Sequence, residues 1–219
     1  PANGALIING DIDNLEYFTK DLDCKVITVG SEESGSMYTA KNITFDEFAH
    51  GSYDLYVEGE FKHRVTLKVT GMHNIYNSLA AIATAHFLNI DKEDILNGLE
   101  AYGGTDRRFQ FKGKLGDITV IDDYAHHPVE IKATLATAKL IKHNKTYCVF
   151  QPHTYTRTKT LFDEFTTCFG SAYELILMDI YAAREKDTGL VSSNELGDAI
   201  RKTGMNCINV HSHEEAVNY

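Results

Sequence analysis

The chain has 219 residues and a formal net charge of −10, an acidic balance that argues against a general nucleic-acid-binding surface. Hydrophobic residues make up 43% and charged residues 24% of the chain, which is typical of a soluble globular protein. No apolar run is long enough to span a membrane, and the first residues do not resemble a signal peptide. We therefore expect a cytoplasmic protein of one large or two small domains. It would bind small molecules, neither nucleic acid nor membrane.

The cysteines and the first residue bear on the context of the chain. The cysteines are Cys24, Cys148, Cys168 and Cys207; they contain no CxxC pair and mostly lie among apolar residues. Reduced thiols of a cytosolic protein explain this pattern best. Because the chain begins with Pro1 and not with Met, we expect it to be part of a longer protein.

The first half predicts strands interrupted by helices. Apolar runs predict strands at 5–9 and 25–30, and Asp11 or Asp13 is placed to cap a helix that ends near Lys20. Further strands are predicted at residues 37–45, 53–58 and 63–69. The last of these alternates apolar and polar residues, which is typical of an antiparallel strand with one solvated face.

Single histidines also occur in this half, at His50, His63 and His86. An isolated histidine is more often a surface or core residue than a ligand, so we assign none of them to a site.

A helix of small residues is predicted from Gly71 to about Phe87. Its first turns carry His73, Asn74 and Asn77, and the spacing of three places the two asparagines on one face. A carboxamide offers a donor beside an acceptor, which matches the N6/N7 edge of adenine. The alternative is that one asparagine caps the helix and the other is merely exposed.

A second helix, capped by Asp91, is predicted to end near Tyr102, where Gly103-Gly104 interrupts the chain. We place the domain boundary there, which gives domains 1–104 and 105–219. Two adjacent glycines change φ and ψ at little steric cost, so the pair is also a candidate hinge.

The most informative stretch follows an apolar, β-branched run at 118–121 that predicts a buried strand. Pro128 and Glu130 suit the first turn of the next helix. Five reactive side chains lie between them: Asp122, Asp123, Tyr124, His126 and His127. A purely structural turn needs Gly, Asn or one Asp, so we interpret this turn as part of a site at the carboxyl end of a parallel strand.

Two later strands are also followed by charged and aromatic residues. Strand 147–151 precedes His153 and Arg157. Strand 174–178 precedes Asp179, Tyr181, Arg184 and Glu185. Helices are predicted at 129–143, 160–169 and 192–202, with a strand at 206–210. Three such groups at the same edge of one sheet predict a ligand site there. The adjacent arginines that open this domain could form a solvated turn or reach phosphates with bidentate contacts.

The sequence contains no GxxxxGK[ST], GxGxxG or HExxH motif. Several blocks nevertheless resemble the Mur ligases, most closely the alanine-adding branch. The blocks are Gly71-Met72-His73-Asn74-x-x-Asn77, Arg107-Arg108-Phe109, Asp122-Asp123-Tyr124-Ala125-His126-His127-Pro128-x-Glu130, Gln151-Pro152-His153-x-Tyr155-x-Arg157-Thr158 and Asp179-Ile180-Tyr181-Ala182-Ala183-Arg184-Glu185.

The resemblance implies an α/β fold in which the last part of a central ATP-binding domain is followed by a Rossmann-like, mostly parallel C-terminal domain. It implies an ATP-dependent ligase of peptidoglycan synthesis that joins L-alanine to UDP-N-acetylmuramate through an acyl phosphate, with Mg²⁺ as a second cofactor. The family's UDP-sugar domain, phosphate loop and magnesium ligands would lie before Pro1, so we assign no metal ligand within this chain.

The same resemblance implies residue roles for the nucleotide. His73, Asn74 and Asn77 would hold adenine, Arg108 would reach the phosphates and Asp123 the ribose.

For the amino acid, Tyr124, His126, His153 and Arg157 would shape the L-alanine pocket, with Arg157 on the carboxylate. We expect Arg108 and His126 to take part in catalysis.

Three alternatives stay open. A tripeptide-recycling ligase of the same family carries similar blocks, although Tyr124 in place of Phe favours the alanine-adding branch. From another class, Asp122, Asp123, His126 and His127 could hold Mn or Zn in a phosphohydrolase. The chain could also be a nucleotide-binding module without catalytic activity.

Overall fold

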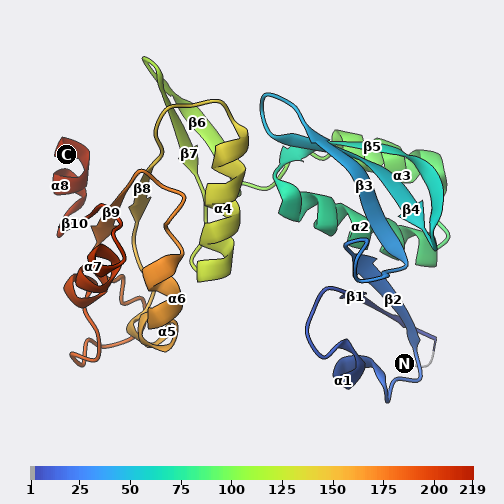
Figure 1. Cartoon of the computed structure of the whole chain (residues 1–219), viewed down its shortest axis with the longest axis horizontal. Helices are drawn as coiled ribbons and strands as arrows, with labels where there is room; N and C mark the ends of the chain where they lie inside the picture. The colour runs from blue at the N-terminus through green and yellow to red at the C-terminus, as the bar shows by residue number, and fades with distance from the viewer. Residues whose placement is uncertain (1–2) are drawn as a thin grey trace. The chain divides into compact units, whose positions relative to one another are not determined.

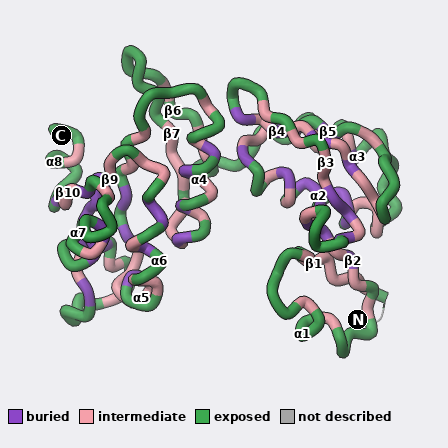
Figure 2. Tube along the Cα trace, in the orientation of Figure 1, coloured by how far each residue is buried: buried purple, intermediate pink, exposed green. Residues whose placement is uncertain are grey.

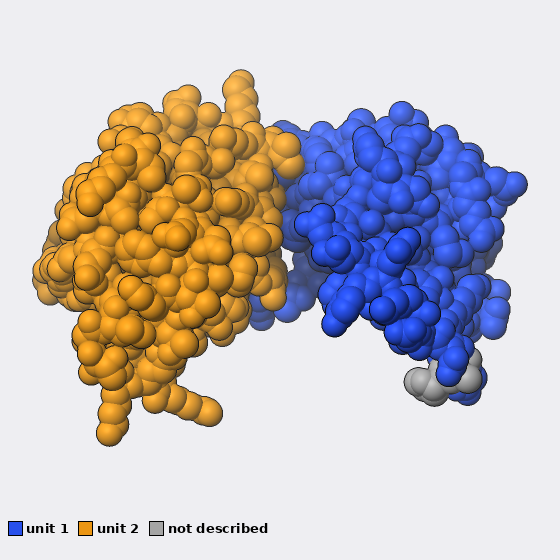
Figure 3. Space-filling model, turned by 60° about the horizontal axis from the view of Figure 1, so that its bottom comes forward, with its two compact units in different colours: residues 1–106 blue, residues 107–219 orange. Residues whose placement is uncertain are grey.

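A computed structural model describes residues 3–219 and shows two compact units, one ending at Asp106 and the other beginning at Arg107 (Figures 1 and 3). Each unit has its own buried core (Figure 2). The division lies close to Gly103-Gly104, and Gly104 has a φ of 99°, a left-handed conformation that glycine adopts without strain.

The first unit is a mixed sheet with helices packed against it. Its elements are β1 (Ala5–Asn9), α1 (Leu15–Thr19), β2 (Lys25–Gly30), β3 (Tyr38–Phe45), β4 (His50–Val57), β5 (Glu60–Thr70), α2 (Met72–Phe87) and α3 (Lys92–Ala101). The strand order is β1-β2-β3-β4-β5; β1, β2 and β3 are parallel, and β4 is antiparallel to both β3 and β5. Val65 and Leu67 of β5 are buried while the alternate residues face solvent, so the predicted antiparallel strand is confirmed.

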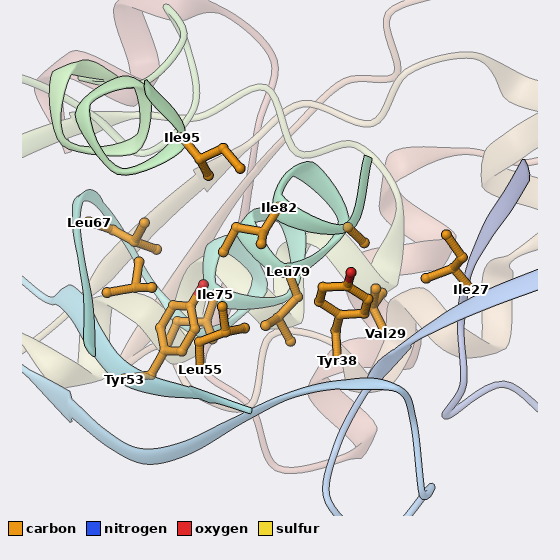
Figure 4. Close-up of a cluster of buried hydrophobic side chains, with 12 residues drawn as sticks. Ile27, Val29, Tyr38, Tyr53, Leu55, Leu67, Ile75, Leu79, Ile82 and Ile95 are labelled. Carbon is orange, nitrogen blue, oxygen red and sulfur yellow. The ribbon is translucent and has the colours of Figure 1, made fainter. Parts of the chain in front are cut away.

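The long helix α2 closes the core of the first unit. Ile75, Leu79 and Ile82, spaced at helical periodicity, are fully buried against Tyr53 and Leu55 of β4 and their neighbours (Figure 4). The start of α2 is therefore fixed by its packing on the sheet, and the residues of its first turns are held in place.

The predicted cap of the first helix is wrong. The residue that precedes α1 is Asn14, which has a left-handed φ of 58° and makes no side-chain capping hydrogen bond. Asp11 instead accepts hydrogen bonds from the backbone N–H and the hydroxyl of Ser31, across the ends of β1 and β2. Asp11 is therefore engaged in a longer-range contact and does not form the local cap that the spacing suggested.

The second unit contains two separate sheets. Its elements are β6 (Gln110–Leu115), β7 (Ile118–Asp122), α4 (Pro128–Leu140), β8 (Tyr147–Phe150), α5 (Tyr155–Thr160), α6 (Phe162–Thr167), β9 (Glu174–Met178), α7 (Ser193–Lys202), β10 (Cys207–Val210) and α8 (His213–Asn218). Strands β10, β9 and β8 form a parallel sheet, and β6 pairs with β7 in an antiparallel hairpin. The predicted α/β class with mostly parallel strands is confirmed.

Three expectations for the second unit are wrong. Strand β7 is not buried: Ile118 is 64% and Val120 48% exposed, because β7 pairs with β6 and is not in the sheet of β8 and β9. The three groups of reactive residues therefore do not share the edge of one sheet. The helix predicted at 160–169 is also different: two short helices, α5 and α6, meet at Leu161, and Arg157 lies inside α5 and not in a loop.

Candidate functional site

The first unit holds the predicted adenine-binding residues at the start of α2. The residue before the helix is Gly71, with a φ of 85° and no side-chain cap, so neither asparagine caps the helix. Asn74 Nδ2 donates to the carbonyl oxygen of Thr70 at 2.9 Å, and Asn77 Nδ2 donates to Asn74 Oδ1 at 3.1 Å. The two carboxamides thus lie on one face, as the spacing predicted. His73 is exposed in the same first turn.

This arrangement exposes the outer amide, that of Asn77, to solvent. Asn77 is exposed, and its Oδ1 and second N–H form an acceptor beside a donor. The hydrogen bond from Asn77 to Asn74 orients that pair. The geometry suits an adenine edge, and that role stays a prediction.

The second unit contains a pocket of about 1330 Å³ that runs along β7, α4 and β8. Five predicted site residues line it: Asp123, Tyr124, His126, His153 and Arg157. They come from the turn after β7, the turn after β8 and helix α5. The structure therefore brings them together although β7 and β8 belong to different sheets.

The turn after β7 is held by Asp123. Its Oδ2 accepts the N–H of Phe109 at 2.7 Å and its Oδ1 accepts the N–H of Ala125 at 2.7 Å. The N–H of Tyr124 donates to the carbonyl of Arg107 at 2.7 Å, and the Arg107 guanidinium lies 4.7 Å from the centre of the Tyr124 ring. Arg107 and Phe109 both have positive φ, 59° and 49°, a costly conformation for non-glycine residues that these contacts stabilise.

Glu130 holds the start of α4 and two of the predicted residues. Its Oε2 accepts the N–H groups of His126 and His127 at 3.1 and 3.2 Å. His127 is the N-cap residue of α4, and together with Glu130 it forms a capping box. Partial burial would raise the pKa of Glu130. The two backbone N–H groups and the nearby His126 and Arg108 outweigh burial and lower that pKa.

Arg108 does not line the pocket. Its guanidinium is 3.9 Å from Glu130 Oε1, and more than half of its side chain is exposed. A cation held loosely in this way can turn toward an anionic ligand. Its contact with phosphates stays a prediction.

The histidines of the two turns approach each other across the pocket. The rings of His126 and His153 are 6.3 Å apart, and the rings of His153 and Tyr181 are 5.6 Å apart. His126 Nδ1 lies 2.9 Å from the Tyr124 carbonyl oxygen, so it is the donor and Nε2 is the acceptor of the neutral ring. Arg157 Nη1 lies 3.1 Å from His153 Nδ1, which makes Nδ1 the acceptor and leaves Nε2–H as a donor.

Arg157 is not paired with the acidic residues of the turn after β7. Its guanidinium contacts the ring and, at 3.4 Å, the carbonyl oxygen of His153, while Asp122 lies 3.9 Å from Arg107. An arginine held by neutral acceptors keeps its full charge for a ligand carboxylate.

The metal-site hypothesis finds no support in the geometry. Asp123 is engaged by backbone N–H groups, Asp122 by Arg107, and His127 Nδ1 by the N–H of Val129 at 3.3 Å. Among residues 3–219, no group of three or more His, Cys, Asp or Glu side chains could hold a metal ion.

Arg107 and Tyr181 also line the pocket. Tyr181 belongs to the group that follows the strand predicted at 174–178 and Arg107 to the arginine pair, but neither was predicted as a site residue. Tyr181 lies three residues after the end of β9, close to the strand end as in the other groups, so the spacing could have identified it. Arg107 could not be distinguished from Arg108 by spacing alone.

Comparison with known proteins gives the family. Residues 107–219 match the family described as "Mur ligase, glutamate ligase domain", and residues 1–85 match "Mur ligase middle domain". The chain belongs to the Mur ligase family.

Within that family, the chain is similar to UDP-N-acetylmuramate–L-alanine ligases. The enzyme of that name from Clostridium beijerinckii is 54% identical over 219 residues, which is 100% of this chain and 48% of that protein. The crystal structure of UDP-N-acetylmuramate-alanine ligase MurC from Thermotoga maritima has a TM-score of 0.75 at 26% identity and covers 97% of this chain and 44% of that one. The chain thus spans about half the length of the curated relatives it matches.

A murein peptide ligase from Psychrobacter arcticus also shares the fold, with a TM-score of 0.65 over all of this chain and 45% of that one. At 22% identity this likeness shows the fold alone.

Among residues 3–219, the helices are too short or too polar to cross a membrane.

Proposed function

We propose that the protein containing this chain is an ATP-dependent ligase that joins L-alanine to UDP-N-acetylmuramate in peptidoglycan synthesis. The observation that carries the proposal is the pocket of the second unit, one part of which is lined by Arg157, His153, His126 and Tyr124. A 54% identical relative over the whole chain bears the name of this activity. Free cysteines support a cytoplasmic location.

The pocket residues suit the binding of a small amino acid. The Arg157 guanidinium offers a planar, two-point contact for the carboxylate of L-alanine, and the His153 Nε2–H is a further donor. His126 Nε2 can accept the proton that the alanine amine loses when it attacks the acyl carbon and displaces phosphate from it. The roles of these residues are to bind, orient and deprotonate the nucleophile.

The nucleotide would be held by the other predicted residues. ATP supplies the phosphoryl group that turns the substrate carboxylate into an acyl phosphate. Asn77, oriented by Asn74, suits the adenine edge, and Arg108 suits negative charge on the phosphates. The Mg²⁺ that the family implies has no ligand set within residues 3–219, so we assign its ligands to the remainder of the protein.

The experiment uses the full-length protein. Purified enzyme with ATP and UDP-N-acetylmuramate should release phosphate only when L-alanine is added, and mass spectrometry should detect the alanyl product. A tripeptide beginning with L-alanine serves as the competing acceptor. Faster turnover with the tripeptide would assign the protein to the recycling ligases and overturn the proposal.

The 219-residue chain alone is the matched control. It lacks a GxxxxGK[ST] loop and, among its described residues, a metal-ligand set, so nothing in it would neutralise the transferring phosphoryl group. It should neither hydrolyse ATP nor form the amide.

A further inference from the structure

The loop after β9 carries an acidic residue that contacts the start of α5. Glu185 Oε2 accepts the backbone N–H of Thr156 at 2.9 Å, in the first turn of that helix. Helix α5 is six residues long, so a contact with its first turn restrains the whole helix.

The same two loops are joined along their backbones. The N–H of Thr154 donates to the carbonyl of Tyr181 at 2.9 Å, and the N–H of Tyr181 donates to the carbonyl of Pro152 at 2.8 Å. Ala183 has a φ of 53°, and the N–H of Glu185 donates to the carbonyl of Ala182 at 2.9 Å, which turns the chain back toward α5. Glu185 is thus held at the position from which it reaches Thr156.

Helix α5 in turn carries Arg157 into the pocket. Arg157 follows Thr156 directly, and its N–H is accepted by the Thr154 hydroxyl at 3.4 Å. Its guanidinium contacts His153, and both side chains line the pocket, whereas Glu185 does not. A shift of the first turn of α5 would therefore move the Arg157 guanidinium relative to His153.

We propose that Glu185 is a positioning residue for amino-acid binding: it fixes the first turn of α5 and so sets the place of the Arg157 guanidinium. The inference rests on the proposed function, since it concerns the same pocket. It adds a residue outside the pocket on which the recognition of the substrate carboxylate depends.

The chain offers a matched control. Glu195 accepts the N–H and the hydroxyl of Ser192 in the capping box of α7, the same kind of contact at a helix that contributes no residue to the pocket. Glu195→Ala should lower the thermal midpoint without changing the KM for any substrate.

The test compares Glu185→Ala, Glu185→Gln and Glu195→Ala in the full-length enzyme. Glu185→Ala should raise the KM for L-alanine roughly tenfold, because small displacements of a binding group are costly, and leave the KM for ATP within about twofold. Glu185→Gln keeps an oxygen that can accept the Thr156 N–H and should recover much of the loss. Hydrogen exchange of the peptide covering α5 should be faster in Glu185→Ala than in the wild type.

The outcomes separate the two proposals. No alanine-dependent turnover by the wild-type enzyme would overturn the proposed function and, with it, this inference. Normal wild-type turnover with an unchanged KM for L-alanine in Glu185→Ala would overturn the positioning role alone. A KM that rises equally for ATP and L-alanine, or that rises as much in Glu195→Ala, would show that Glu185 only stabilises the fold.

Discussion

Asp123 Oδ2 accepts the backbone N–H of Phe109 at 2.7 Å and so ties the turn that carries Arg107 and Arg108 to the turn that carries Tyr124 and His126. Phe109 and Asp123 are 14 residues apart in sequence and meet at the end of the β6–β7 hairpin. The carboxylate therefore has a structural role in addition to any contact with a nucleotide ribose.

Replacing Asp123 should consequently lower stability. Asp123→Ala leaves the N–H groups of Phe109 and Ala125 without their acceptor, which should reduce the free energy of unfolding by about 1–3 kcal/mol. Urea denaturation of the full-length protein measures this change. Asp122→Ala is the control: its side chain is 3.9 Å from Arg107 and half-exposed, so the loss should be below about 1 kcal/mol. Equal losses in both variants would contradict the structural role.

The sequence predicted the local features of the site better than their arrangement. The spacing of Asn74 and Asn77 was enough to place them on one face, because a helix has a fixed period. The strand at 118–121 was predicted correctly, but its burial was not, since burial depends on which strand it pairs with. The residues that follow β7 and β8 line one pocket although the two strands belong to separate sheets. This arrangement depends on tertiary packing, which the local sequence pattern does not reveal.

The position of Arg157 shows the same limit. A run of Thr, Arg and Lys residues gives no apolar periodicity, so α5 was not predicted. The helix is instead stabilised by Thr154 as its cap and by Glu185 from the next loop. Contacts from a distant segment cannot be predicted from the local pattern.

The lowered pKa of Glu130 predicts that the free energy of unfolding depends on pH. Because its folded-state pKa is lowered, its contribution to stability is fully present above pH 4.5, its ordinary pKa, and is lost as the pH falls through the lower folded value. At pH 7, Glu130→Gln should lower the free energy of unfolding by about 0.5–1 kcal/mol, since the charge at the start of α4 is lost. The difference between variant and wild type should shrink as the pH falls below 4.5.

Chemical denaturation at a series of pH values measures that difference. A gap between wild type and Glu130→Gln that stays constant from about pH 7 to pH 3 would show that the carboxylate charge is not what stabilises the turn.

Asn77→Ala should weaken ATP binding in the full-length enzyme. A bidentate contact to adenine contributes about 1–3 kcal/mol, so the KM for ATP should rise roughly ten- to hundredfold. The kcat should change less, because a contact far from the reacting phosphate contributes mainly uniform binding. Asn77 is exposed, so the thermal midpoint should barely move. A collapse of kcat at constant KM for ATP would assign Asn77 another role.

Arg157→Lys tests the contact with the substrate carboxylate most directly. Lysine keeps the positive charge but loses the planar, two-point geometry of the guanidinium. The lost charge-assisted hydrogen bond contributes about 1.5–3 kcal/mol, so the KM for L-alanine should rise by roughly one to two orders of magnitude. Arg157 contacts His153 and not a carboxylate, so the KM for ATP and the thermal midpoint should stay close to those of the wild type. Steady-state kinetics with varied L-alanine and thermal unfolding of the same samples measure both quantities. An early-unfolding variant with an unaltered KM for L-alanine would show that Arg157 acts only by holding the turn at His153.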